Sequence, residues 1–242
     1  MIKQRNAARH SERVKTSYIT NLSHEIRTPM NGILGFAELL KQEDLSDADK
    51  KTYINLINEN GNTLLNLLNN IISFSKIEDK HTSISLSKFH ASEVLKRVYS
   101  ALSYKPSELV DFKVLASESD EDLIQSDMVL LYQIISNLCF NALKVTKEGF
   151  VHLDLNIEDQ HITFIIKDTG LGICQTKHAN LFKQFEQDRS NNDTLNLEGS
   201  GLGLTISYKL SQLLEGELNF ESKKGLGSTF YLKLLKTKSP SA

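Results

Sequence analysis

Apolar and small residues recur at steps of three and four along the first eighty residues, which is the period of an amphipathic helix. The first run is Ile19, Leu22, Ile26, Met30, Ile33, Ala37 and Leu40, and the second is Ile54, Ile57, Gly61, Leu64, Leu68 and Ile71. A polar turn, QEDLSDADK, separates them. The pattern predicts an antiparallel helical hairpin. Because two helices cannot bury both apolar faces alone, we expect two copies of the chain to form a dimeric four-helix bundle.

The later part of the chain has a different character. Three of the twelve glycines fall in residues 1–148 and nine in residues 149–242, which favours strands and tight loops there. Helices are predicted at 91–102, 127–146 and 202–214, and strands at 151–157, 161–168, 217–220 and 228–234. These elements predict an α/β sandwich with a mixed sheet. A polar stretch at 79–88 separates a helical domain at 1–80, which includes a basic N-terminal signalling helix at 1–15, from a second domain at 85–236.

Charge and apolar content limit the partners. A net charge of -2 and a pI near 6.4 give no global basic surface, so nucleic acid is not expected. The basic segment 1–15 is typical of a chain that follows a membrane span on the cytoplasmic side, or of a solvated helix face. No run of 18 apolar residues is present, so the chain itself is expected to be soluble and cytoplasmic. Cys139 and Cys174 lack CxxC spacing and are expected to be buried.

The sequence SHEIRTP contains a candidate nucleophile, His24. This histidine is two positions from both Leu22 and Ile26, so the helical period directs it away from the apolar face. Glu25 can accept a hydrogen bond from Nδ1 of the ring, which leaves Nε2 as the free lone pair. Thr28 lies at i+4 on the same face as His24, and Pro29 removes a helical hydrogen bond one turn after it. An ordinary surface histidine is the alternative interpretation.

The sequence SNLCFNALKVT places Asn137 and Asn141 at i and i+4, with Lys144 three residues further on. One helix face therefore offers two amide oxygens and an ammonium group. Amide oxygens suit a hydrated Mg²⁺, and an ammonium group suits phosphate. Capping or solvation of the two asparagines is the alternative.

Two glycine-rich segments follow. Asp168 ends an alternating strand and precedes Gly170 and Gly172, where a buried carboxylate can accept a hydrogen bond from the amino group of adenine. A helix with phosphate-binding amides at its N-terminus is predicted after the second segment, EGSGLGL, whose glycines are Gly199, Gly201 and Gly203. The segment is neither a Rossmann fingerprint nor a Walker A loop. The polar residues before it are predicted to form a lid, with Phe182 and Phe185 as anchors or as ordinary core residues.

In this order, SHEIRTP, NLCFNALK, DTGLGI, LFKQF and GSGLGL resemble the motifs in the catalytic core of bacterial sensor histidine kinases, hybrid two-component sensors among them. The resemblance covers residues 14–236 and implies an ATP-binding domain of the kind shared with Hsp90, gyrase and MutL. It implies that His24 accepts the γ-phosphoryl group with Glu25 as its orienting base, and that Thr28 positions water for dephosphorylation. The implied ligands of MgATP are Asn141 and Asn137 for Mg²⁺, Lys144 for phosphate, and Asp168 and Thr229 for adenine.

The same resemblance implies a homodimer that passes its phosphoryl group to an aspartate of a response-regulator receiver domain, with phosphatase activity as well. Membrane attachment is expected only through segments outside this chain. Val145 stands where the family usually has an aromatic residue, Leu130 where arginine is frequent, and Gln187 where a basic residue is common. Val145 and Gln187 keep open an alternative function, a non-catalytic dimeric scaffold that binds nucleotide or a receiver. A conformational ATPase of the Hsp90 or gyrase kind is a second alternative.

Overall fold

The computed structural model describes residues 23, 26–42, 44–78, 84–103, 108–117, 119–182 and 202–236. The basic segment 1–15, the pair His24 and Glu25, and the glycines Gly199 and Gly201 lie outside the described residues. The chain divides into two compact units. One is the N-terminal helical part up to Lys76, and the other begins at Ile77 and contains the sheet.

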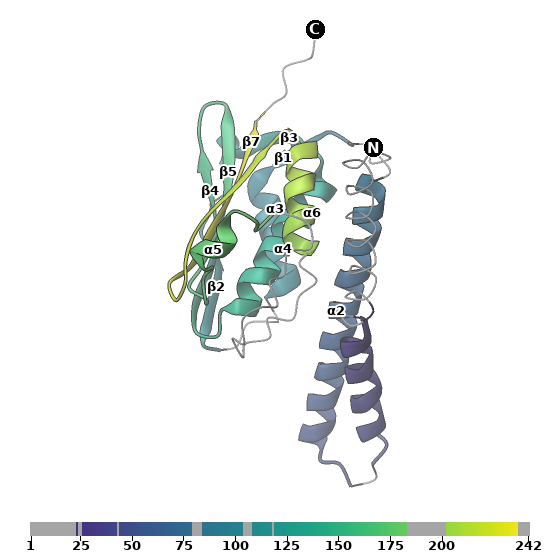
Figure 1. Ribbon diagram of the computed structural model, residues 1–242. Helices are drawn as coiled ribbons and strands as arrows, with labels where there is room; N and C mark the ends of the chain where they lie inside the picture. The colour runs from purple at the N-terminus through teal and green to yellow at the C-terminus, as the bar shows by residue number, and fades with distance from the viewer. Residues whose placement is uncertain are drawn as a thin grey trace, which may run out of the picture. The chain divides into compact units, whose positions relative to one another are not determined.

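The first unit is a helical hairpin, as the sequence predicts (Figure 1). One helix covers residues 26–39, and the second, α2 (Asp47–Glu78), begins after a reciprocal cap in which Ser46 Oγ accepts from the Asp49 amide at 3.1 Å. The rings of Phe36 and Tyr53 stack between the two helices with centroids 5.9 Å apart. Among the hairpin residues whose burial the structure describes, Pro29 alone is buried, and the others are half-buried or exposed.

The second unit contains a five-stranded sheet with the strand order β2-β4-β5-β7-β6. The strands are β2 (Val110–Val114), β4 (Gly149–Ile157), β5 (His161–Asp168), β6 (Glu217–Lys223) and β7 (Gly227–Leu235). β2 pairs with β4 in parallel, and every other pair is antiparallel, so the prediction of a mixed sheet is confirmed. A separate antiparallel ribbon joins β1 (Ser87–His90) to β3 (Leu123–Ser126), which follows the short 3-10 helix η1 (Asp120–Asp122).

Three helices, α3 (Ala91–Leu102), α4 (Met128–Val145) and α6 (Leu202–Leu213), cover one face of the sheet (Figure 1). The core between these layers is fully buried and includes Leu95, Leu138, Phe164 and Ile206. The sheet's opposite face carries polar residues at alternate positions, as expected for a sheet with helices on one side only. The prediction of an α/β sandwich is therefore confirmed.

Most predicted elements lie within a few residues of their observed bounds. The predicted helix 127–146 begins at Met128, because Asp127 is its N-cap, and ends at Val145, because Thr146 is its C-cap. The predicted strand 217–220 extends to Lys223. The sequence analysis did not predict β1, β2, β3, η1 or the single-turn helix α5 (Gln175–His178).

Among the described helices, α4 alone is long and apolar enough to cross a membrane by length and composition, with a mean hydropathy of 1.4. Its apolar side packs in the core, where Leu131, Ile134, Ile135 and Leu138 are fully buried. The position of α4 in the core therefore explains its apolar composition.

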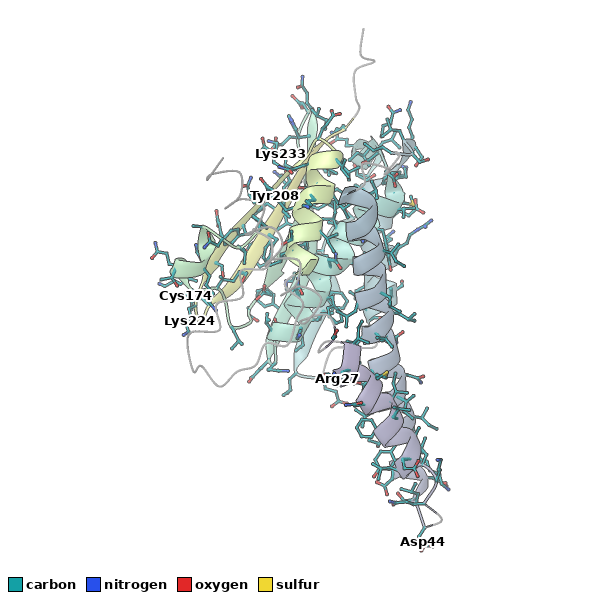
Figure 2. The ribbon with its side chains drawn as sticks, turned by 45° about the vertical axis from the view of Figure 1, so that its right-hand side comes forward. Arg27, Asp44, Cys174, Tyr208, Lys224 and Lys233 are labelled. Carbon is teal, nitrogen blue, oxygen red and sulfur yellow. The ribbon has the colours of Figure 1, made fainter. Side chains whose placement is uncertain are left out.

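The two cysteines differ in their surroundings. Cys139 is buried in α4 as predicted, and burial raises the pKa of its thiol. The prediction is wrong for Cys174, which is half-buried as the N-cap residue of α5. A hydrogen bond from Thr176 lowers the pKa of the Cys174 thiol, with smaller contributions from Lys224 and Lys177. Figure 2 shows Cys174 and Lys224 at the same end of this unit.

Candidate functional site

The polar face of α4 meets the first turn of α6. A Cβ built on Gly203 would lie 3.6 Å from Asn141 Nδ2 and 4.0 Å from Asn137 Cγ, so both asparagines approach the α6 backbone. Asn137 Nδ2 is buried and makes no hydrogen bond within the described part of the chain. A buried amide without a partner is costly unless a ligand or water completes it. The structure therefore brings together Asn137, Asn141 and Gly203.

Both ends of α4 are fixed by side chains. Asp127 Oδ1 accepts from the amides of Val129 and Leu130 at 2.9 and 3.0 Å. At the other end, Thr146 donates its hydroxyl to the carbonyl of Ala142 at 2.8 Å. Lys144 lies in the last turn, half-buried, three residues after Asn141. These caps hold the helix, and with it the two asparagines, in a defined position.

Asp168 is the buried carboxylate at the end of β5, with 4% of its surface exposed. Its Oδ1 accepts from the amide of Gly170 at 2.8 Å and from the amide of Ser228 at 3.2 Å. Oδ2 accepts from no residue that the structure describes. Burial raises the pKa of the Asp168 carboxyl, and the two amide donors oppose this shift in part. One oxygen is thus fixed by the backbone and the other is available for a ligand.

The glycines after Asp168 are required by close backbone packing. A Cβ on Gly170 would lie 2.8 Å from both Cγ2 and the carbonyl oxygen of Val145, at the end of α4. Gly172 has a φ of +61° and lies against the carbonyl of Lys223. Gly227 has a φ of +95° and lies against the carbonyl of Asp168. These contacts join α4, the loop after β5 and the β6–β7 hairpin around Asp168.

Hydrogen bonds hold the same loop on the hairpin. Ile173 donates its amide to Ser222 Oγ at 2.7 Å, and Ser222 donates its hydroxyl to the Gly227 carbonyl at 3.0 Å. The amide of Gly225 donates to the Leu171 carbonyl at 2.7 Å. The DTGLGI segment is therefore a fixed loop in this structure, and the position of Asp168 is set on both sides.

The β5–β7 register distinguishes Ser228 from Thr229. Asp168 pairs with Ser228, whereas Thr229 pairs with Lys167. Because side chains alternate along a strand, Ser228 shares the helix-covered face with Asp168 and Thr229 lies on the opposite face. The family resemblance implied that Thr229 contacts adenine, whereas the register places Ser228, and not Thr229, beside Asp168. The alternation of apolar residues in STFYLKL contained the signal, since Phe230 and Leu232 share a face with Ser228.

Several predicted site residues are not placed beside these groups. His24, Glu25, Gly199, Gly201, Phe185 and Gln187 lie outside the described residues. Thr28 is an exposed residue of the helix at 26–39, and Pro29 is buried in the same helix.

Phe182, one of the two predicted lid anchors, is half-buried and packs against other aromatic rings. It stacks on Tyr208 of α6 with centroids 5.0 Å apart and meets Phe220 edge to face at 5.6 Å. Tyr208 is labelled in Figure 2. These ring contacts favour ordinary packing, rather than a lid anchor, as the role of Phe182 in this structure.

Two family models match the chain. Residues 14–80 match the His Kinase A (phospho-acceptor) domain, and residues 126–238 match the histidine kinase-, DNA gyrase B- and HSP90-like ATPase. The second match contains α4, the Asp168 loop, α6 and the β6–β7 hairpin. The second unit thus has the fold and the nucleotide-site elements of this ATPase class.

Curated relatives include two bacterial sensor proteins. The autoinducer 2 sensor kinase/phosphatase LuxQ of Vibrio vulnificus is 36% identical over 239 residues, which cover 95% of this chain and 27% of LuxQ. The sensor histidine kinase GacS of Pseudomonas protegens is 34% identical over 239 residues, which cover 95% of this chain and 26% of GacS. The chain thus spans about a quarter of the length of these relatives.

Solved structures agree with this assignment. The full-length ShkA structure in complex with AMPPNP matches with a TM-score of 0.63 and 28% identity, over 94% of this chain and 46% of ShkA. The histidine kinase ThkA in complex with the response regulator protein TrrA matches with a TM-score of 0.62 over 98% of this chain and 66% of that one, at 20% identity, which supports the fold alone. The chain belongs to the histidine kinases and contains their phosphoacceptor and ATPase domains.

Proposed function

We propose that this chain is the phosphotransferase core of a two-component sensor. It transfers the γ-phosphoryl group of MgATP to His24, and from His24 to an aspartate of a response-regulator receiver domain. The observation that carries the proposal is the proximity of Asn137 and Asn141 to the first turn of α6 in an ATPase fold. The same chain also contains SHEIRTP in its phosphoacceptor domain. The kinase/phosphatase name of LuxQ and the ThkA–TrrA complex support the receiver as partner and phosphatase activity as a second function.

The residues of the second unit fit a nucleotide with a divalent cation. Asn137 has a buried amide nitrogen without a partner within the described residues, and this N–H donor could bond to an oxygen of the nucleotide. Asn141 and Asn137 would supply amide oxygens to Mg²⁺, and Lys144 would contact phosphate. Asp168 would accept the adenine amino hydrogen at Oδ2 and so would select adenine over guanine. MgATP supplies the electrophilic γ-phosphorus and, as ADP, the leaving group.

The chain's own groups account for the transfer to histidine. His24 Nε2 supplies the lone pair for the new N–P bond, while the bond from phosphorus to the bridging oxygen of ADP breaks. Glu25 accepts the hydrogen bond from Nδ1 and takes the Nδ1 proton, so the phosphorylated ring is neutral. Orientation by Glu25 holds the reacting lone pair in one direction, which contributes to the rate.

The hairpin surface supports a homodimer. The hairpin exposes a stripe of large apolar residues, at Met30, Leu34, Ile54, Leu65, Leu68 and Ile72. A stripe of this kind is typical of a face that a second helical hairpin covers. Within the proposal, residues 1–80 form the dimerisation and phosphoacceptor domain, 85–236 form the ATP-binding domain, and the chain acts in the cytoplasm.

Incubation with γ-labelled ATP and Mg²⁺ tests the function. A kinase gives protein-bound label that is acid-labile and base-stable, a conformational ATPase releases phosphate without labelling, and a scaffold does neither. His24→Gln should abolish labelling and leave nucleotide affinity unchanged, whereas the control His161→Gln, on β5, should label normally. Acid-labile label that persists in His24→Gln would assign the acceptor to another residue.

A further inference from the structure

Ser85, which lies just before β1, is hydrogen-bonded to Asp127, the N-cap residue of α4. The backbone amide of Ser85 donates to Asp127 Oδ2 at 2.8 Å, across 42 positions of sequence. The other oxygen of the same carboxylate caps α4 through the amides of Val129 and Leu130. Asp127 is 5% exposed. One buried side chain therefore holds both the incoming chain and the helix that carries Asn137 and Asn141.

The acceptor of this bond is itself fixed. Asp127 follows β3 directly, and β3 pairs with β1 in a register that places Ser87 opposite Ser126. The amide of Gln125 in β3 donates to the carbonyl of Lys236, just beyond the end of β7, at 2.7 Å. The Ser85–Asp127 bond therefore ties the incoming chain to a rigid part of the unit.

The bond shortens the tether between the end of α2 and the paired strands of the ATPase fold. Ser85 follows Glu78, the last residue of α2, by seven positions, so the tether can span at most about 25 Å. Without the bond, the first residue held by pairing is Ser87, and the limit rises to about 32 Å. The effective concentration of a tethered domain depends on this length and on the direction in which the chain leaves its anchor.

We propose that Asp127 is a positioning residue for phosphoryl transfer to histidine. Its Oδ2 sets the length and direction of the tether that delivers the nucleotide to the phosphoacceptor helix, and its Oδ1 separately caps α4. This inference rests on the proposed kinase function. The two oxygens of Asp127 then have separate effects. Loss of the α4 cap at Oδ1 weakens nucleotide binding, whereas loss of the Ser85 bond at Oδ2 slows only the delivery of the nucleotide to the phosphoacceptor helix.

Three variants of the intact chain separate the effects. Ser85→Pro removes the donating amide and leaves the α4 cap intact. Ser85→Ala is the matched control, because it removes the hydroxyl but keeps the amide. Asp127→Ser keeps an N-cap oxygen for α4 but is too short to hold Ser85 as well. Labelling rate at saturating MgATP, nucleotide affinity by calorimetry and the melting temperature are measured for each variant.

Ser85→Pro and Asp127→Ser should each lower the labelling rate by about threefold or more, with nucleotide affinity and melting temperature near wild type. The double variant should be no slower than either single variant, because both lose the same bond. A wild-type labelling rate in Ser85→Pro, or multiplied losses in the double variant, would overturn the inference. Absence of labelling in the unmodified chain would instead overturn the proposed function, and the inference with it.

Discussion

Ser228 and Asp168 lie opposite each other on β7 and β5, and the Ser228 amide donates to Asp168 Oδ1 at 3.2 Å. A second amide, from Gly170, reaches the same oxygen at 2.8 Å. Two donors on one oxygen fix the orientation of the carboxylate and leave Oδ2 without a donor among the described residues. The cost of this arrangement is burial of a charge, and burial raises the pKa of Asp168.

Asp168→Asn should stabilise the protein at neutral pH and abolish selective adenine binding. Because the folded-state pKa of Asp168 is raised, the native state carries no penalty from this group below the unfolded pKa of about 4. Stability from this group is then lost as the pH rises through the folded pKa. Asp168→Asn has no charge to bury, so it avoids this loss of stability. Its amide oxygen can still accept from the amides of Gly170 and Ser228. The melting temperature should exceed that of wild type at pH 7, and the difference should shrink toward zero as the pH falls to about 4.

Nucleotide affinity of Asp168→Asn, measured by calorimetry, should fall by at least about tenfold, the loss expected for one buried hydrogen bond to a ligand. Asp154→Asn, on the open face of β4, is the control and should leave affinity unchanged. A lower melting temperature than wild type at pH 7 would show that the charged carboxylate is a net stabilising group here.

Asn141→Ala should weaken MgATP binding by about tenfold or more, because the cation loses an amide ligand beside Gly203. The dependence of affinity on Mg²⁺ concentration should also become shallower. The matched control is Asn156→Ala on β4, an exposed asparagine whose amide donates to Glu158 at 3.3 Å. Unchanged affinity in Asn141→Ala would remove this residue from the site.

The sequence predicted the parts of this protein that local patterns determine. The apolar period predicted α4 to within one residue at each end, and the i, i+4 spacing of Asn137 and Asn141 predicted a shared polar face. Long-range pairing was not predictable in the same way. β1 is four residues long, and only its pairing with β3 defines it as a strand. The alternation in STFYLKL predicts that Ser228 shares a face with Phe230, but the pairing of Ser228 with Asp168 depends on the register with β5, which no local pattern reports.

Leu68→Glu should dissociate the proposed dimer. Leu68 is 41% exposed in the single chain and lies on the exposed apolar stripe of the hairpin. Full burial of a leucine contributes about 1.5–3 kcal/mol, and a dimer could bury at most the exposed 41% of Leu68 in each of two symmetric positions, so the dimer dissociation constant should rise by at least about tenfold. Glu59→Lys, an exposed position on the opposite side of α2, is the control. If the Leu68→Glu protein still sediments as a dimer at low concentration, another surface joins the subunits.

Thr28→Ala should slow dephosphorylation of the receiver and leave phosphorylation of His24 intact. Thr28 is exposed on the helix at 26–39 and follows His24 by four positions in the sequence, a spacing that on a continuous helix places two side chains on one face. A hydroxyl without an activating base is a poor nucleophile, but it can hold one water in line with phosphorus. Labelling and transfer should stay near wild type, while loss of phosphate from a receiver labelled by the wild-type protein should slow by about ten- to a hundredfold. Thr52→Ala is the control, because that exposed hydroxyl donates only to the Ala48 carbonyl, at 2.9 Å. Equal loss of both activities in Thr28→Ala would show that the threonine supports the helix beside Pro29, and an unchanged dephosphorylation rate would assign the water to another group.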